Sequence, residues 1–374
     1  MKRYSLLIIS ISCIIIYIIF NSSEGSVPIE DIGISSGISL DLITNRPLNQ
    51  YSIVSSIYNF NKKDEISSEI LEGIGKTIPD TRSNRQTISG KLYFLGLQKV
   101  FIFSEYFATS GINHLIDILM TNQEMNDAAW LVVCKDKAVD MLKFKVNDAP
   151  TAADHINDMI ESSKNQNFMS KDYKVIDMYV RVNSEGRDLV IPYLEILNKK
   201  ITISSMAVFN KDIMAAKIPM KEARYMNFLR NNKVKGILTL QKDPSHWIST
   251  YGEVKRKVHC EKINNKYKFN IDIEFKGKVA NNTLYNDFMN DPKTIEKYSH
   301  ELGEETQKMC NEFIYKMQNT YKTDCLELGR DAAATFGRNP KTDWNNIVCN
   351  ADIIVNVKVK VDSLGRGQFL FEPK

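Results

Sequence analysis

In the first half of the chain, the apolar positions predict a strand, a helical segment, a second strand and a further helix. Residues 97–103 and 130–134 are short runs of apolar, β-branched and aromatic side chains, which are typical of strands buried on both faces. The apolar residues between them recur at helical spacing, and Gly111 divides them into two short helices. They are Phe107, Ile112, Leu115, Ile116 and Leu119. Because parallel neighbours need a crossover connection, this order predicts a parallel pair of strands, with the next helix starting at Ala138.

The same reading predicts further strands and helices along the chain. Strands are predicted over residues 175–182, 201–209, 267–275 and 353–361, and a strand or a bent hairpin over residues 26–43. A helix is predicted over residues 152–163, and a glycine turn at 73–77 is interpreted as the end of another helix, followed by a polar loop to Asn84. A long helix opens at Asp291 and Pro292, a favourable N-cap and first-turn pair, and extends to residue 324. Its apolar stripe predicts that one face packs on a sheet.

These elements predict an α/β and α+β protein. A chain of 374 residues is too long for one small core, so we expect three mixed α/β domains, with sheets flanked by helices, after an N-terminal membrane segment. The predicted divisions are a signal or membrane anchor over 1–25, an N-terminal α/β domain over 26–148, a middle domain over 149–220 and a C-terminal α+β domain over 221–374. The long helix 291–324 belongs to the last of these.

The N-terminal segment, residues 4–20, is rich in isoleucine and carries no charge, and Lys2 and Arg3 precede it. Residues 6–20 form an uncharged run that is mostly isoleucine and cover roughly 22–25 Å as a helix. The preceding positive charges predict a cytoplasmic N-terminus, with the rest of the chain outside. An uncleaved anchor, a cleaved signal near residues 23–25 and a lipoprotein signal are all open at this point.

Composition excludes some classes of partner and cofactor. The net charge of +4 is spread over scattered lysines, so nucleic-acid binding has little support. The chain has 6 cysteines, and the five beyond Cys13 contain no C-x-x-C pair. We therefore expect free thiols, mostly buried, and neither a disulfide framework nor a zinc site.

Two short motifs suggest enzymes but lack the required context. Residues 33–37 satisfy G-x-S-x-G, whose serine must be followed directly by a helix, whereas here a two-residue alternation continues after Ser35. Residues 73–77 end like a phosphate-binding loop, but Ile70 stands where the first glycine is needed. The histidines lack metal-binding spacing, and Glu301 and Glu305 are expected on a solvated helix face. The prediction is no catalytic, cofactor-binding or metal-binding residues, no cofactor and no enzymatic activity.

Weak sequence matches to one family occur in the same order along the chain. Residues 100–142 resemble the strand, helix-start and "A-K-G-K-A" segments of the Ger(x)C family, the C subunits of spore germinant receptors. Further residues that carry the resemblance are Glu30, Asp31, Gly37, Asp41, Ala207, Val208, Phe209, Asp212, Glu222, Leu229, Gln318, Asp324, Leu328, Gly329, Pro340, Trp344 and Gly365. Family members are usually lipidated at a cysteine that begins the mature chain, whereas Cys13 here lies inside the apolar run.

The resemblance implies a membrane-anchored, non-enzymatic receptor subunit. It would assemble with integral-membrane A and B subunits at the outer face of the spore inner membrane and help nutrients to trigger germination. The alternative is an extracytoplasmic solute-binding protein of a transporter, which needs two similar lobes around a cleft. A cell-wall hydrolase would need a helix after Ser35 and a paired histidine.

Overall fold

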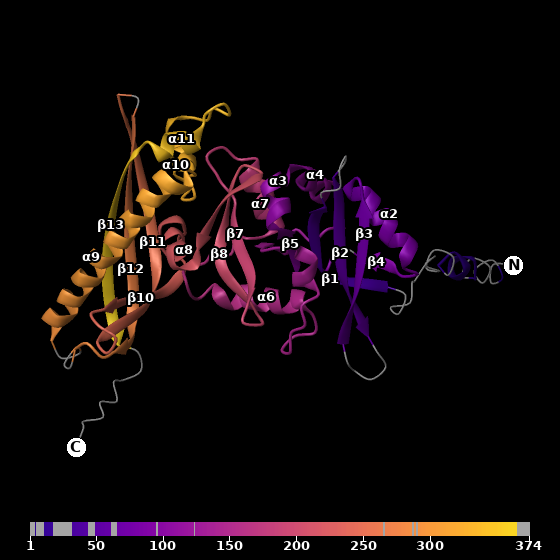
Figure 1. The fold of residues 1–374 in the computed structure, drawn as a ribbon, viewed down its shortest axis with the longest axis horizontal. Coiled ribbons are helices and arrows are strands. Elements are labelled where there is room, and N and C mark those ends of the chain that lie inside the picture. The colour runs from indigo at the N-terminus through magenta and orange to yellow at the C-terminus, as the bar shows by residue number, and fades with distance from the viewer. Residues whose placement is uncertain are drawn as a thin grey trace, which may run out of the picture.

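The predicted parallel pair lies at the centre of a large sheet (Figure 1). In this computed structural model, β5 (Val100–Ser104) and β6 (Trp130–Cys134) pair in parallel. The structure describes residues 4, 11–17, 32–43, 49–60, 66–94, 96–122, 124–264, 266–285, 288 and 291–364. Within them the sheet has the order β3-β2-β1-β5-β6-β7-β8-β9, with β4 beside β1. Its other strands are β1 (Ile32–Ile43), β2 (Gln50–Phe60), β3 (Ile66–Gly75), β4 (Leu92–Phe94), β7 (Val190–Leu197), β8 (Lys200–Asn210) and β9 (Ile213–Pro219).

The central strands of the large sheet are parallel and the outer ones antiparallel. β1, β5, β6 and β7 run in parallel, whereas β2 and β3 on one side and β8 and β9 on the other reverse direction. α3 contacts both β1 and β9, which are far apart in the strand order, so the sheet curls around this helix. The helices of this part are α2 (Ile78–Ile88), α3 (Glu105–Ser110), α4 (Asn113–Thr121), α5 (Ala138–Leu142), α6 (Ala152–Ser163) and α7 (Val175–Val182). We call residues 32–219 the N-terminal lobe.

The C-terminal lobe, residues 235–364, contains a small sheet with the order β10-β11-β12-β13 within the described residues. Its strands are β10 (Lys235–Gln241), β11 (Trp247–Ile263), β12 (Lys266–Asn282) and β13 (Asp352–Leu364). α9 (Pro292–Lys316) packs along β13, where Gly303 allows a close approach to the strand backbone. α10 (Leu328–Phe336) and α11 (Trp344–Cys349) follow, and α8 (Met220–Arg230) joins the two lobes.

Most of the predicted elements are confirmed, and mixed α/β layers with helices flanking the sheets are observed. The break at Gly111 and the helix over 152–163 appear at the predicted places. Ser35 lies in β1 and is buried, with no helix after it, as the rejection of the hydrolase motif required. The division at residue 148 stays a prediction, although β6 and β7 come from either side of it and pair in the same sheet.

The prediction of a strand over 175–182 is wrong, because these residues form α7. The β-branched and aromatic composition suggested a strand, but the buried residues Val175, Met178 and Arg181 recur every three positions. Asp177 caps the helix by accepting a hydrogen bond from the backbone N–H of Lys174 at 3.0 Å.

The prediction of a helix end at 73–77 is also wrong. Gly73 and Gly75 end β3, and α2 begins where a polar loop was expected. Thr77 and Asp80 form a capping box that starts α2. A Cβ on Gly73 would lie 2.1 Å from the carbonyl oxygen of Thr81, so the glycines allow α2 to pack directly on the strand.

The long helix is shorter than predicted. α9 begins at Pro292 with Asp291 as its N-cap, as expected, but the α-helix ends at Lys316 and a π-helical turn, η2 (Met317–Tyr321), follows. Lys322 then adopts the left-handed conformation with φ 51°, which stops the helix before Asp324.

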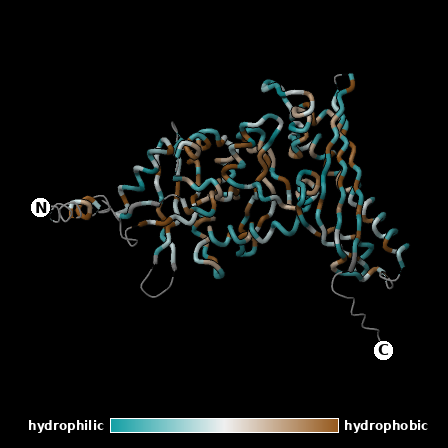
Figure 2. Tube along the Cα trace, turned by 180° about the vertical axis from the view of Figure 1, so that it is seen from behind, coloured by the Kyte–Doolittle hydropathy of each residue, from teal (hydrophilic) through white to brown (hydrophobic). Residues whose placement is uncertain are grey.

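Of the predicted membrane segment, the structure describes residues 4 and 11–17, which are helical. Ile14, Ile15 and Ile16 are all at least half exposed, and the described segment near the N-terminus is partly brown, the colour of hydrophobic residues, in Figure 2. Among the described residues, no helix combines the length and the apolar character that crossing a bilayer requires. The predicted cleavage site at 23–25 lies outside the described residues, as do the predicted strand residues 26–31. All six cysteines are free thiols, and Cys134, Cys310 and Cys325 are buried.

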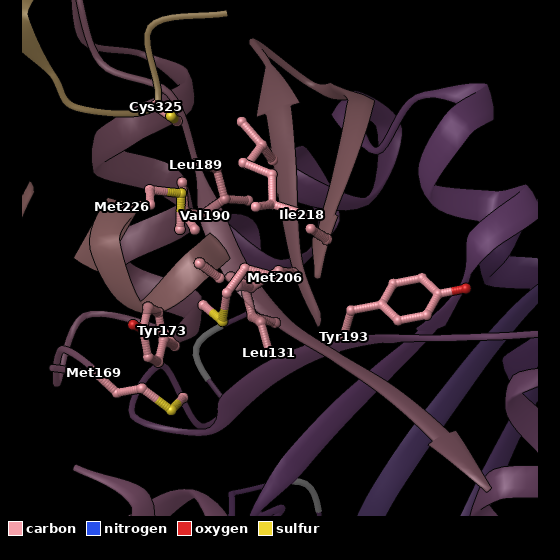
Figure 3. Packing of buried hydrophobic residues seen from close by; sticks show 14 of the residues in the cluster. Leu131, Met169, Tyr173, Leu189, Val190, Tyr193, Met206, Ile218, Met226 and Cys325 are labelled. Carbon is pink, nitrogen blue, oxygen red and sulfur yellow. The ribbon is translucent and has the colours of Figure 1, made fainter. Parts of the chain in front are cut away.

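An aromatic cluster joins the lobes. The rings of Phe168 and Phe228 lie 5.0 Å apart, and both approach Phe275, at 6.1 and 6.2 Å. These residues come from the N-terminal lobe, α8 and the small sheet, so the apolar core continues across the junction. Figure 3 shows the same continuity nearby, where Met226 of α8 and Cys325 lie beside Leu189 and Val190.

We predict that Phe228→Ala lowers the free energy of unfolding by about 3–5 kcal/mol, because it removes the middle ring of this cluster and leaves a cavity. Denaturant unfolding followed by circular dichroism measures the loss. Tyr315→Ala is the control, since Tyr315 is 68% exposed and its removal is expected to change stability by less than about 0.5 kcal/mol. Equal losses in the two variants would contradict the role of the cluster.

Candidate functional site

The two lobes touch through their backbones at a pair of glycines. A Cβ placed on Gly186 would lie 2.2 Å from the carbonyl carbon of Gly329, and one on Gly329 would lie 2.7 Å from the Cβ of Trp344. Gly186 also has φ +67°, a conformation that side chains disfavour. Beside this contact, Glu185 accepts hydrogen bonds from Trp344 Nε1 at 2.7 Å and from the Asn339 backbone N–H at 2.9 Å. Any larger residue at Gly186 would push the lobes apart.

Glu327 is the charged centre of the junction. Its carboxylate accepts hydrogen bonds from Arg230 at 2.7 Å, Arg181 at 2.9 Å and Arg330 at 3.1 Å, and it lies 3.7 Å from Arg187. Glu327 precedes α10 with φ 58°, an uncommon conformation for a residue with a side chain. The arginines therefore hold both the carboxylate and the strained backbone that starts α10.

The surrounding charges keep Glu327 ionised. Burial alone would raise the pKa of its carboxyl, but the neighbouring guanidinium groups, above all Arg230 and Arg181, outweigh burial and lower the pKa to about 2. The folded-state pKa is below the unfolded value of 4.5, so this contribution to stability is complete above pH 4.5 and is lost as the pH falls towards 2.

Arg230 also joins backbone groups of the two lobes, and a further arginine, Arg256, joins those of α8 and the C-terminal lobe. Arg230, the last residue of α8, donates to the carbonyl oxygen of Asp188 at 2.9 Å and to that of Cys325 at 2.6 Å. Arg256 of β11 donates to the carbonyl oxygen of Leu326 at 3.1 Å and to Asp331 at 3.2 Å. Each guanidinium thus satisfies carbonyl groups that a loop at a domain boundary would otherwise leave unpaired.

Asp324 and Asp188 are buried carboxyls on opposite sides of this contact. Asp324 accepts the backbone N–H groups of Leu328 at 3.1 Å and Gly329 at 2.7 Å, and so caps α10. Burial raises its pKa to about 6, and these hydrogen bonds offset part of the effect. Burial and the nearby Asp324 raise the pKa of Asp188 to about 7. Asp188 Oδ2 has no hydrogen-bond partner among the described residues.

Two cavities flank the junction. The larger, which we call the junction cavity, has a volume of about 1100 Å³ and lies between residues 182–188 and 210–215 of the N-terminal lobe and residues 324–345. The smaller, which we call the arginine cavity, has a volume of about 550 Å³ and is lined by the arginines described above. Arg187 and Arg330 line both cavities.

The structure assigns structural roles to the polar residues noted in the sequence. Asp324 and Trp344 both lie in the junction. Glu305 is exposed on α9 as expected, whereas Glu301 is partly buried and accepts a hydrogen bond from the Tyr285 hydroxyl at 3.2 Å. Within the described residues, no three histidine, cysteine, aspartate or glutamate side chains are grouped so that they could hold a metal ion. Sequence reasoning missed Glu327 and its arginines. The available signal was Arg181, a charged residue within an apolar run.

Two family matches together cover most of the chain. Residues 25–196 match the family described as spore germination protein N-terminal domain, and residues 204–365 match the one described as spore germination B3/GerAC like, C-terminal. The chain therefore belongs to the family of GerAC-like spore germination proteins. Within that class it is a C subunit of a germinant receptor, and the resemblance to the Ger(x)C family is confirmed.

Individual relatives agree with this assignment. The spore germination protein GerQC of Bacillus cereus is 22% identical over 288 residues, which cover 75% of this chain and 77% of GerQC. The crystal structure of the GerBC protein matches with a TM-score of 0.58 and 13% identity, covering 87% of this chain and 97% of GerBC. At that identity the likeness concerns the fold alone.

We predict that Gly186→Ala weakens the junction more than Gly337→Ala does. Both glycines have positive φ, but a Cβ on Gly337 meets nothing within 4 Å, whereas one on Gly186 collides with the backbone of the other lobe. Gly337, with φ 98° and ψ 151°, bears the larger backbone strain, so a greater loss at Gly186 reports the contact. We expect Gly186→Ala to lose about 2 kcal/mol or more relative to Gly337→Ala in denaturant unfolding. Equal losses would show that the lobes can separate there without cost.

We also predict that Asp188 makes the protein less stable as the pH rises. Its pKa of about 7 is above the unfolded value of 3.8, so its favourable contribution is complete below pH 3.8 and is lost as the pH rises through 7. Asp188→Asn removes this loss and is expected to be more stable than the native protein at pH 8, by on the order of 2 kcal/mol. Thermal unfolding from pH 4 to 8 measures the difference, and similar stability of the two proteins at pH 4 is the internal control. An unchanged pH slope would contradict the assignment.

Proposed function

We propose that this protein is the membrane-anchored, non-enzymatic C subunit of a nutrient germinant receptor. It assembles with the integral-membrane A and B subunits, and its lobes lie at the outer face of the spore inner membrane. Nutrient recognition by the assembled receptor then leads to germination. The observation that carries this proposal is that both family regions occur in order and together span residues 25–365.

The N-terminal segment supports the anchoring part of the proposal. Residues 11–17 form helix with large apolar side chains turned to solvent, an arrangement that is unfavourable in water and favourable in lipid. Lys2 and Arg3 precede the segment and favour an orientation with the lobes outside the cytoplasm. An uncleaved helical anchor fits these features, because Cys13 lies within the apolar run.

The arrangement of the lobes supports a role in coupling. Figure 1 shows the small sheet at one end of the long axis and β1 to β4 at the other, towards the membrane segment. The aromatic cluster, the Gly186–Gly329 contact and the Glu327 ion pairs join the two ends. A movement imposed by partner subunits on one lobe would therefore be carried to the other as a rigid-body motion.

The transporter alternative has less support from the architecture. A solute-binding protein of that kind needs two similar lobes, whereas here a large sheet with parallel central strands stands against a small, mainly antiparallel one. The lobes are also fused by a common apolar core and by α8, which leaves little freedom for closure around a solute.

We predict that spores lacking this chain lose the response to a defined set of nutrients. The measurement is dipicolinate release, with dodecylamine, a non-nutrient trigger, as the control that germination machinery downstream is intact. Supplying the native chain or Tyr315→Ala should restore the response. A chain with Ile15→Asp and Ile16→Asp should not restore it, because each charge opposes insertion into lipid by about 2.5–3.5 kcal/mol.

Two results would contradict the proposal. The first concerns spores from which all other nutrient receptors have been removed. If these spores still respond to every nutrient when this chain is also absent, a receptor role is excluded. Full restoration by the doubly substituted chain, with the protein recovered in the soluble fraction, would exclude the N-terminal anchor.

A further inference from the structure

The arginine cavity carries more positive than negative charge. Arginines 181, 187, 230, 256 and 330 line it together with three carboxylates, those of Asp172, Glu327 and Asp331. The difference leaves a formal charge of +2 on the lining. The charges are partly buried, so water screens them less than it screens charges on an open surface. Such a lining attracts anions.

Four of these arginines are already occupied by the protein. Those at positions 181, 230, 256 and 330 each donate hydrogen bonds to at least two oxygen atoms of the chain. Their role in holding the lobes together accounts for their presence. They supply positive potential, but few free donors.

Arg187 differs from the other four. Its guanidinium donates no hydrogen bond to any described residue, and its nearest acidic group, Glu327, is 3.7 Å away and already paired with three other arginines. The side chain is 25% exposed, and none of its nitrogens is among the fully buried polar atoms that lack a partner, so the donor fork stays accessible from the cavity. Burial lowers the pKa of Arg187, Glu327 opposes this shift, and the guanidinium groups of Arg330, Arg181 and Arg230 add to it.

Other unused donors line the same cavity. The Oδ1 atom of Asn232 accepts the backbone N–H of Arg256, which leaves its amide N–H groups free. The Ser170 hydroxyl accepts from the backbone N–H of Asp172 and donates to no described group. Planar guanidinium and amide donors of this kind suit the oxygen atoms of phosphate and carboxylate groups.

We propose that the arginine cavity binds a small, multiply charged oxyanion of the phosphate or polycarboxylate class, with Arg187 as its principal ligand. The anion would accept two parallel hydrogen bonds from the Arg187 fork and would neutralise the excess charge of the lining. Arg187 lies between Gly186, which meets the other lobe, and Asp188, whose carbonyl oxygen accepts a hydrogen bond from Arg230, so a bound anion would also tighten the contact between the lobes.

The test is binding of phosphate or citrate to the full-length protein in detergent micelles, at constant ionic strength against chloride. Isothermal titration calorimetry gives the affinity, and thermal unfolding gives the stabilisation. We expect saturable binding of at least one of the two anions, with a rise in melting temperature. A response to phosphate alone identifies a phosphoryl ligand, and a response to citrate alone identifies a polycarboxylate.

Matched variants locate the site. Arg187→Gln should weaken binding by about tenfold or more, since it removes a charged donor fork. Arg338→Gln is the control, because Arg338 is exposed and lines only the junction cavity. Arg187→Lys keeps the charge but loses the fork, so an intermediate affinity is expected.

Three results would overturn the proposal. They are the absence of saturable binding by either anion, an unchanged affinity in Arg187→Gln, and an equal loss in Arg338→Gln. The germination response does not enter this test, so a failed anion site leaves the receptor assignment standing. Loss of the receptor assignment would likewise leave a measured anion site in place.

Discussion

The burial of one carboxylate among several guanidinium groups is the constraint on which the arrangement of the lobes depends. Glu327 belongs to the C-terminal lobe, Arg181 and Arg187 belong to the N-terminal lobe, and Arg230 ends the helix between them. Glu327 could not be buried without these arginines, because its carboxylate would lose its hydration with no compensating partner. The ion pairs therefore define one relative placement of the lobes, and the apolar contacts around them add most of the stability.

Hydrophobic and electrostatic contacts stabilise this junction in different ways. The aromatic cluster buries apolar surface, and this stabilisation does not depend on the direction of the contact. The hydrogen bonds of Arg230 and Arg256 to backbone carbonyl groups are directional and fix the loop between η2 and α10. The glycine pair sets how closely the backbones approach. For a germinant receptor subunit, the junction gives the surfaces of the two lobes one defined placement.

The sequence allowed the local elements to be predicted better than their assembly. Apolar runs identified β5 and β6 because strands in a parallel core are buried on both faces. The error at α7 arose because β-branched composition was weighed above the three-residue spacing of its buried residues. The error at β3 arose because Gly73 and Gly75 indicate a turn, whereas their actual role, close approach of α2, involves residues that follow later in the chain.

Most of the candidate site could not be predicted from the sequence, because its residues are far apart in the chain. Glu327 and Arg181 are separated by about 150 residues, and nothing in either local pattern indicates the other. Asp324, Gly329 and Trp344 were noticed only through the family resemblance. Each of them turns out to support the junction, by capping α10, by meeting Gly186 and by binding Glu185.

The aromatic cluster also has a consequence for the order in which the chain folds. The lobe that contains Phe168 is synthesised before Phe275, which follows about a hundred residues later in the chain. At roughly 5–20 residues per second, the N-terminal lobe then waits on the order of 5–20 s with an apolar surface uncovered. During that interval the nascent lobe is exposed to wrong partners, so its survival depends on how fast translation delivers β12.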